Sequence, residues 1–251
     1  MSRRGAGAPT AAAPLLAVAL WAIVAAGWPS PALPGPIDVL AAGVDAAVNG
    51  PLVADLTASL RRVLRGYLLA VGLAVPLGAV AALGGPWGLG LRWLVAALRP
   101  IPPLAWVPLA ILWFGLGDPS AVFIVGIGAF LPVFLETGWW LSRPPPQLME
   151  LAASLGAGPW LTLRAVRLPA AAPGLLGGLR TGLGLAWTSV IAAELVGAQS
   201  GLGYRIQALR LGLDTAGVMA TMLVIGALGA AMDAALGALS RRALRWPVGV
   251  A

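Results

Sequence analysis

The sequence contains no cysteine, no histidine and no lysine. Without cysteine the chain forms no disulfide and no thiolate metal site. Without histidine the usual zinc, haem and catalytic-triad sites lose their main ligands or bases. Because there is no lysine, no glycine-rich segment ends in the Lys-Ser or Lys-Thr of a P-loop. We therefore expect a chain that is not an enzyme, holds no cofactor or metal of its own and does not bind ATP.

Charged residues are also scarce. They make up 10% of the chain, against about 25% in an average soluble domain. Hydrophobic residues make up 59%, and the mean hydropathy is +0.90. All 16 basic residues are arginine, and the net charge of +7 is spread between apolar stretches, which argues against nucleic acid as a partner. We expect most of the surface to face lipid.

Long stretches without any charge recur along the chain. They are Gly66–Leu91, Pro100–Gly117, Pro119–Leu135 and Thr215–Met232. Each is about long enough to cross the ~30 Å hydrocarbon core of a membrane. The alternative, a cleaved signal peptide followed by a secreted domain, leaves these stretches unexplained. No segment alternates with period two as barrel strands do, so we expect an all-α polytopic membrane protein, with 1–251 as a single transmembrane domain.

Hydropathy predicts six transmembrane helices. They are expected near Pro14–Trp28, Gly66–Leu83, Arg92–Gly115, Ala121–Leu141, Pro173–Leu195 and Ala216–Leu239. The proline-rich segment after Trp28 cannot continue a helix, and a surface helix is expected at Ile37–Asn49. Tight turns at Gly84–Pro86 and Gly115–Pro119 end the second and third helices.

The distribution of arginine predicts the orientation. With the amino terminus in the cytoplasm, nine arginines fall inside and five outside, as the positive-inside rule favours. The inside set is Arg3, Arg4, Arg92, Arg143, Arg164, Arg167, Arg241, Arg242 and Arg245, and the outside set is Arg61, Arg62, Arg65, Arg205 and Arg210. Both termini and the segment 143–172 are then cytoplasmic.

The segment 143–172 has a distinctive pattern. Three prolines begin it in an extended form, and good helix formers follow at Gln147–Leu155. Gly156–Pro159 breaks the helix, which resumes at Trp160–Leu168. A short hairpin of helices outside the membrane is suited to packing into a groove of another protein. The alternative is a plain solvated connector.

Residues of this segment stand at a recognisable spacing: Glu150, Ala152, Gly156, Val166, Leu168 and Pro169, with Leu151 where the pattern often has alanine, followed by Ala153. In this spacing the segment resembles the EAA loop of ABC importer permeases. Three further regions resemble the nitrate, sulfonate and taurine branch of that family. They are 59–67, then 99–108 with 113–117, and Glu194 with 201–204.

This resemblance implies a type I ABC importer permease with six transmembrane helices in the inner (plasma) membrane. It implies a second permease subunit, as a homodimer, and separate ATPase subunits that hold ATP and Mg²⁺. It also implies a periplasmic or lipid-anchored solute-binding protein that delivers a small anion such as nitrate, a sulfonate or taurine. The stretch from Glu150 to Gly156, with Leu168 and Pro169, would form the coupling loop that docks on the ATPase.

Four ionisable residues lie within predicted spans, where a charge costs about 2.5–3.5 kcal/mol to insert: Arg99, Glu136, Arg180 and Glu194. Arg180 either meets an anion in the cavity or extends outward to the interface. Glu194 is either part of an outer gate or a cap for the turn that follows it. We expect Glu136 and Asp233 to pair with Arg143 or Arg241 near the cytoplasmic side.

Proline and glycine mark two further features. Pro100, Pro102, Pro103 and Pro108 predict an irregular third span that borders either the translocation route or the bundle centre. Gly177, Gly178, Gly182 and Gly184 predict close helix packing, or a pore lined by small residues. An ion-coupled carrier or an intramembrane enzyme is the alternative function. A carrier has no reason to possess the loop at Glu150, and the sequence shows no clustered carboxylates for an enzyme.

Overall fold

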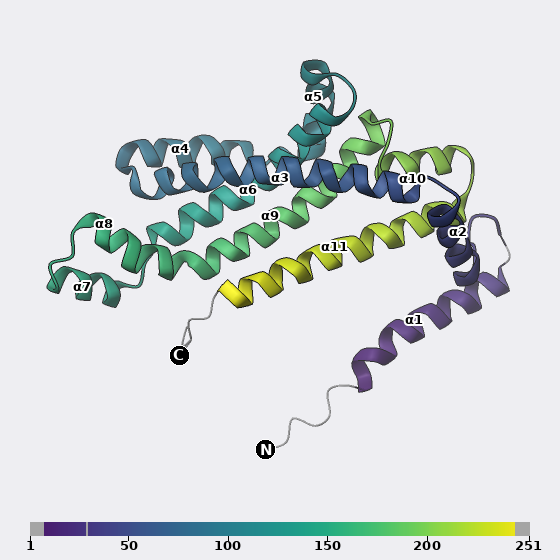
Figure 1. Ribbon diagram of the computed structural model, residues 1–251, viewed down its shortest axis with the longest axis horizontal. Coiled ribbons are helices and arrows are strands. Elements are labelled where there is room, and N and C mark those ends of the chain that lie inside the picture. Colours follow the sequence, from purple (N-terminus) through teal and green to yellow (C-terminus); the bar gives the residue numbers. More distant parts are fainter. Residues whose placement is uncertain (1–7, 29, 244–251) are drawn as a thin grey trace.

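A computed structural model describes residues 8–28 and 30–243, and this part of the chain is helical with no strand (Figure 1). The all-α prediction is confirmed. The elements are α1 (Ala8–Gly27), α2 (Pro36–Val48), α3 (Leu52–Leu83), α4 (Gly85–Leu98), η1 (Pro103–Trp106), α5 (Val107–Phe114), α6 (Asp118–Ser142), α7 (Pro146–Ser154), α8 (Pro159–Thr162), η2 (Leu163–Arg167), α9 (Leu168–Gly197), α10 (Leu202–Leu211) and α11 (Thr215–Ala243). Arg3, Arg4, Arg245 and both predicted cytoplasmic termini lie outside the described residues.

Four helical stretches within the described residues are long and apolar enough to cross a membrane: Leu52–Leu83, Asp118–Ser142, Pro159–Gly197 and Thr215–Arg242. A bent pair, Gly85–Leu98 with Pro103–Phe114, makes a fifth if it counts as one span. The remaining apolar helix, Ala13–Gly27, is shorter. The count of six crossings therefore stays a prediction. The predicted surface helix is present as α2.

The third predicted span is not one helix. The axes of α4 and of the η1–α5 segment differ by 86°, so the prediction of a single helix at Arg92–Gly115 is wrong. The helix ends at Leu98 because the prolines that follow lack the N–H a helix needs and clash with the preceding turn. Pro102 is extended (φ −67°, ψ 146°) and starts η1 at Pro103. The predicted irregularity of this segment is confirmed.

Helix α6 is the centre of the bundle, with α3 and α9 packed on it. Glycines make these contacts close, since a Cβ at Gly66 or Gly78 of α3 would overlap α6. Gly178 and Gly182 of α9 approach α6 in the same way, whereas Gly177 and Gly184 have no neighbour there. The predicted packing role is confirmed for Gly178 and Gly182 only.

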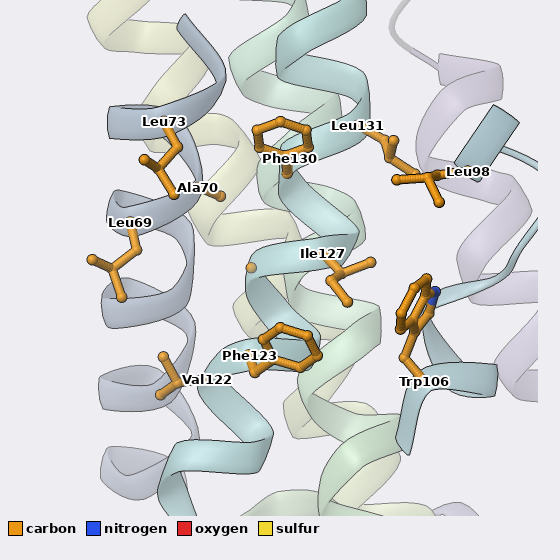
Figure 2. Close-up of a pocket in the computed structure, with 11 residues that line it drawn as sticks. Leu69, Ala70, Leu73, Leu98, Trp106, Val122, Phe123, Ile127, Phe130 and Leu131 are labelled. Carbon is orange, nitrogen blue, oxygen red and sulfur yellow. The ribbon is translucent and has the colours of Figure 1, made fainter. Parts of the chain in front are cut away.

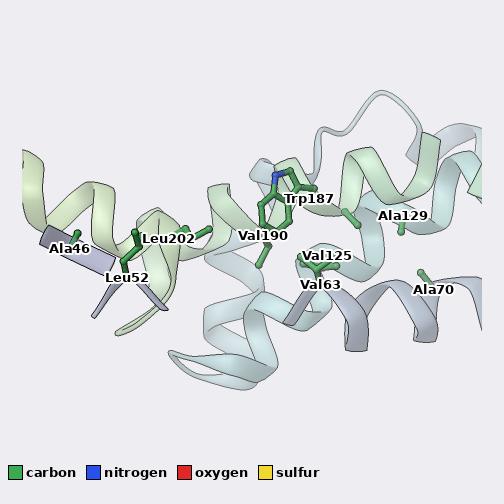
Figure 3. Packing of buried hydrophobic residues seen from close by; sticks show 10 residues of the cluster. Ala46, Leu52, Val63, Ala70, Val125, Ala129, Trp187, Val190 and Leu202 are labelled. Atoms are coloured by element: carbon green, nitrogen blue, oxygen red, sulfur yellow. The ribbon is translucent and has the colours of Figure 1, made fainter. Parts of the chain in front are cut away.

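Small and branched side chains fill the space between these three helices (Figure 3). Val63 from α3, Val125 from α6 and Val190 from α9 are fully enclosed. Trp187 covers them, and its indole N–H donates to the Ile225 carbonyl of α11 (3.1 Å). This contact attaches α11 to the core, although few of the described residues of α11 are buried.

The bundle has two distinct ends (Figure 1). The hairpin of α7 and α8 lies at one end, beside the last residue of α3, Leu83. Helices α2 and α10 lie at the other end, and α11 runs from there back toward the α7 end. Helix α1 diverges from the bundle; its Trp21 indole donates to the Pro34 carbonyl (3.1 Å).

Several helices extend beyond the predicted limits. Helix α3 begins at Leu52 rather than Gly66, and α9 begins at Leu168 rather than Pro173. Hydropathy reports the apolar part of a helix, whereas the backbone continues through polar turns that are still helical.

Candidate functional site

The first helix of the predicted coupling loop has a defined start and a defined end. Pro145 is extended (φ −54°, ψ 127°), so α7 begins at Pro146, a position that needs no N–H. At the other end the Ala157 N–H donates to the Ala152 carbonyl (2.9 Å) and the Gly156 N–H to the Ala153 carbonyl (3.0 Å). These two bonds form a Schellman motif, with Gly156 at φ +70°. The result is a short helix of fixed length and direction.

The second part of the loop continues into the membrane. Helices α8 and α9 with η2 between them form one apolar helical stretch, Pro159–Gly197, of 39 residues. The prediction that the helix resumes at Trp160–Leu168 is confirmed, but the helix continues into α9 instead of ending at Leu168. Segment η2 is a π-helix that ends at Arg167, two residues before Pro169. The wider turn accommodates a proline that has no N–H and that would clash with the carbonyl four residues earlier.

The loop presents apolar side chains to its surroundings. Leu151, Leu155 and Trp160 are 55%, 76% and 72% exposed, and Glu150 is also exposed. Ala152 is buried, and a groove of about 720 Å³ lies between α7 and α8, with Met149, Ala153 and Trp160 among its walls. Leu168 and Pro169 are exposed further along. An exposed apolar patch on a rigid hairpin is typical of a protein docking site.

At the opposite end, side chains of α3 and α9 cap the start of α10. The Gly201 N–H donates to Asp55 Oδ1, the Leu202 N–H to Ser59 Oγ and the Gly203 N–H to Glu194 Oε2, each at 2.9 Å. These are the N–H groups that a helix start leaves without a partner. The interpretation of Glu194 as a cap for the turn is therefore the one that its contacts support.

Arg62 of α3 joins the same cluster. Its Nη1 lies 2.7 Å from Glu194 Oε1 and 2.6 Å from the Ser200 carbonyl, and its Nε lies 2.7 Å from Asp118 Oδ1. Asp118 is the first residue of α6, so one guanidinium holds together α3, α6, α9 and the turn before α10. Arg62 and Glu194 are both buried, and a buried ion pair of this kind requires every partner to be in place.

Arg180 pairs with an aspartate of the last helix. Its Nε and Nη2 lie 3.0 and 2.6 Å from the two carboxylate oxygens of Asp233, in the two-pronged geometry typical of Arg–carboxylate pairs. Both side chains remain about half exposed, at 44% and 55%. They line a small cavity of about 150 Å³ with Trp187 and Gly184. The predicted pairing of Asp233 with Arg143 or Arg241 is wrong.

The proline-rich break borders an apolar cavity of about 390 Å³ (Figure 2). Leu98 and Trp106, on either side of the break, face Ile127 and Leu131 of α6 across it. Arg99, Pro102 and Pro103 do not line this cavity, and Arg99 and Pro102 are exposed. The cavity has no charged wall residue and thus no chemistry for an anion.

Among the described residues Glu136 forms no ion pair with an arginine. Its carboxylate accepts the indole N–H of Trp140, one turn along α6 (3.0 Å). Arg143 lies over the ring of Trp139 instead, with the guanidinium carbon 3.1 Å from the ring centroid. The predicted pair of Glu136 and Arg143 is therefore wrong. A cation over an indole face keeps its N–H donors free for another acceptor.

Comparison with known families decides the identity. The profile of the family described as "Binding-protein-dependent transport system inner membrane component" matches residues 74–245. The chain belongs to this family. It is therefore an ABC importer permease, a multi-pass protein of the inner membrane. The matched residues include α7, the η2 segment, Arg180 and Glu194.

Curated relatives agree with this assignment. A probable ABC transporter permease protein of Brucella melitensis is 41% identical, covering 85% of this chain and 87% of its own length. The taurine transport system permease protein TauC of Escherichia coli is 34% identical over 85% of this chain and 80% of its own. The nitrate import permease protein NrtB of Synechococcus elongatus is 30% identical over 86% and 82%.

A solved structure has the same fold. The inward-facing MetNI methionine ABC transporter matches this permease with a TM-score of 0.67 at 22% identity, covering 77% of this chain and 96% of that one. This likeness supports the type I permease architecture and carries no information on the solute.

Sequence reasoning missed most of the cluster around Glu194. It did not single out Asp55, Ser59, Arg62 or Asp118 as partners of this glutamate. A signal was present, because Asp55, Ser59 and Arg62 stand at i, i+4 and i+7 and thus on one face of a helix. Polar residues in this spacing beside an apolar span indicate an internal network in a permease.

Proposed function

We propose that this permease imports a small anion of the sulfonate, taurine or nitrate class, driven by an ATPase subunit that docks on α7. Two relatives with substrates in their names, for taurine and for nitrate, support the anion class. The observation that carries the docking site is the exposed apolar surface of a helix that is capped at both ends. ATP and Mg²⁺ are bound by the ATPase, and a solute-binding protein engages the α2–α10 end.

The continuity of α8, η2 and α9 supports the route of coupling. A displacement of α7 by the ATPase is passed to α9 through the groove contacts between α7 and the α8–η2 segment. The bond from Arg167 Nη1 to the Leu141 carbonyl (3.4 Å) joins η2 to the end of α6. Helix α9 carries both Arg180 and Glu194. ATP-driven closure thus moves the residue pair in the bundle and the capped turn at its far end.

Arg180 is the group that we assign to the anion. Asp233 holds the guanidinium in place while no solute is present, and an entering sulfonate or nitrate competes for the same donors. The half exposure of both side chains supports access for a small anion. Selection among such anions rests with the solute-binding protein.

The predicted topology is part of the proposal. The α7 end faces the cytoplasm, together with both termini, and the α2–α10 end faces outward. The excess of arginine that the sequence predicts for the cytoplasmic side and the return of α11 to the α7 end support it. Two copies of the permease assemble with two ATPase subunits.

Co-purification with the ATPase subunit tests the docking site. Glu150→Ala removes an exposed charge from α7. Gly156→Trp places a large side chain at φ +70° and disrupts the Schellman motif that ends α7. Both variants are expected to lose ATPase association or solute-stimulated hydrolysis in liposomes. For ATPase association, the matched controls are Asp45→Ala, which removes an exposed acid of α2, and Gly158→Ala, at a glycine with open space and φ −69°.

The outcome separates the two functional classes. If the native complex hydrolyses ATP and takes up taurine, an alkanesulfonate or nitrate, and the loop variants do not, the importer is supported. If no ATPase associates and an ion gradient alone drives uptake, the permease acts as an ion-coupled carrier and the proposal fails.

A further inference from the structure

A second polar cavity lies at the α7 end of the bundle, away from Arg180 and Glu194. Its volume is about 460 Å³. Helices α3, α4 and α6 form its walls, through Ala82, Arg92, Phe134, Leu135, Trp139 and Arg143 with Gly138 and Ser142. Neither the transport route nor the coupling contact of the proposed function uses this cavity.

The charge in this cavity is of one sign. Arg92 and Arg143 line it, and no carboxylate does. Among the described residues neither arginine takes part in an ion pair. The Nε of Arg92 is buried and has no hydrogen-bond partner. Two guanidinium groups without a counter-ion, one with an unused buried donor, are suited to an anion with several acceptor oxygens.

The surroundings place this cavity at the edge of the membrane. Trp139 lines it at 54% exposure, with Arg143 stacked on its ring. Tryptophan with a neighbouring arginine is typical of the membrane–water interface. Along α4, the helix that carries Arg92, the large apolar residues Trp87, Trp93 and Leu94 are 87%, 72% and 65% exposed. These side chains give hydrocarbon chains an apolar surface on the helix that carries Arg92.

We propose that this cavity binds the phosphate headgroup of an anionic phospholipid. The phosphate lies between Arg92 and Arg143, and the acyl chains lie along α4. Leu135 and the exposed apolar side chains of α4 favour a lipid over a free phosphate ion, because an ion would leave these apolar surfaces uncovered. The proposal extends beyond import, since it assigns a lipid site to residues that precede the coupling loop.

The position of the site gives the lipid a structural effect. Arg143 follows the last residue of α6, and α7 starts three residues later. A phosphate held by Arg92 and Arg143 joins α4 to the end of α6 from which the coupling hairpin departs. Anionic lipid is therefore expected to stabilise this end of the permease.

Lipid binding to the full-length permease tests the proposal. The purified chain is placed in phosphatidylcholine nanodiscs with and without phosphatidylglycerol, and retained lipid is measured by native mass spectrometry alongside Tm. The native chain is expected to retain phosphatidylglycerol and to show a higher Tm with it. Each arginine near an anionic lipid contributes a similar amount to the binding free energy, and the two contributions add. The double variant Arg92→Gln with Arg143→Gln is therefore expected to weaken lipid retention by about 30-fold.

Controls distinguish the site from general attraction to a basic protein. Arg61→Gln removes an exposed arginine at the other end of the bundle, whose Nε bonds only to the Thr57 carbonyl of its own helix, and it is expected to behave as native. A photoreactive phosphatidylglycerol on the native chain is expected to label peptides 82–93 and 134–143. Unchanged lipid retention in the double variant, or labelling elsewhere, overturns the proposal. So does inorganic phosphate alone that raises Tm as much as phosphatidylglycerol.

Discussion

Arg62 of α3 and Glu194 of α9 form an ion pair of 2.7 Å in which the two side chains are 4% and 0% exposed. They are 132 residues apart in the chain. Ser59, Asp118 and the Gly203 N–H satisfy their remaining donors and acceptors. The pair thus fixes where three membrane helices meet the turn before α10.

Removing one partner of this pair is expected to destabilise the permease strongly. Glu194→Ala leaves the Arg62 guanidinium buried without its main counter-ion, which typically costs about 3–5 kcal/mol of unfolding free energy. Thermal unfolding in detergent measures the loss. Glu150→Ala removes an exposed glutamate and is expected to leave Tm unchanged. A Tm for Glu194→Ala equal to that of Glu150→Ala would show that the pair contributes nothing to stability.

The turn before α10 tolerates no side chain at Gly201. This residue has φ +106°, and an added Cβ would overlap the Glu194 carboxylate. Gly201→Ala is therefore expected to cost more than the backbone strain alone, which is about 1–3 kcal/mol. Gly117→Ala is the matched control, because Gly117 has a similar backbone conformation (φ +115°) but open space around it. Equal Tm losses for the two variants would contradict the packing of Glu194 against the turn.

Two glycines of α3 are expected to respond to alanine in opposite directions. Gly78 faces α6, where a Cβ would overlap Thr137, whereas Gly72 has no neighbour. Gly72→Ala is expected to stabilise the helix by up to about 1 kcal/mol through propensity alone, and Gly78→Ala is expected to destabilise the bundle. The Tm of each variant is compared with that of the native permease. A gain in Tm for Gly78→Ala would mean that α3 and α6 are not in close contact.

Exchanging the charges of Arg180 and Asp233 distinguishes a structural role of Arg180 from a role in transport. Arg180→Asp is expected to abolish import, since it places two carboxylates together and removes the anion's donor. Adding Asp233→Arg restores the ion pair with its partners exchanged. We expect this double variant to recover Tm and assembly but not import, as measured by uptake in liposomes. Full recovery of import by the exchange would show that Arg180 has no direct contact with the solute.

Prolines and glycines at helix ends explain which features the sequence could predict. The limits of α7 agree with the prediction within a residue, because proline starts the helix and Gly156 ends it through contacts within a few residues. The break in the third span was predictable for the same reason. Four prolines within nine residues leave no continuous helix.

Contacts between distant helices explain what the sequence could not predict. Asp233 lies 53 residues from Arg180, and nothing in either neighbourhood indicates this pairing over one with Arg143 or Arg241. Similarly, the spacing that places Arg62 on one helix face with Asp55 and Ser59 does not show that this face is buried while Arg61 and Arg65 are exposed. Which arginine faces the bundle depends on the rotation of α3 against α6, and this is set by packing at Gly66 and Gly78.

The central claim, that α7 is the contact with the ATPase, is tested most directly by cross-linking. The chain contains no cysteine, so a single introduced thiol is the only one in the permease. Leu151→Cys places it on α7, and Leu211→Cys, at 73% exposure on α10, serves as the control. With a thiol reagent that carries a photoreactive group we expect Leu151→Cys alone to form a covalent product with the ATPase subunit, at a yield that changes when ATP is added. Equal products from both positions, or none from Leu151→Cys in an active complex, would contradict the account.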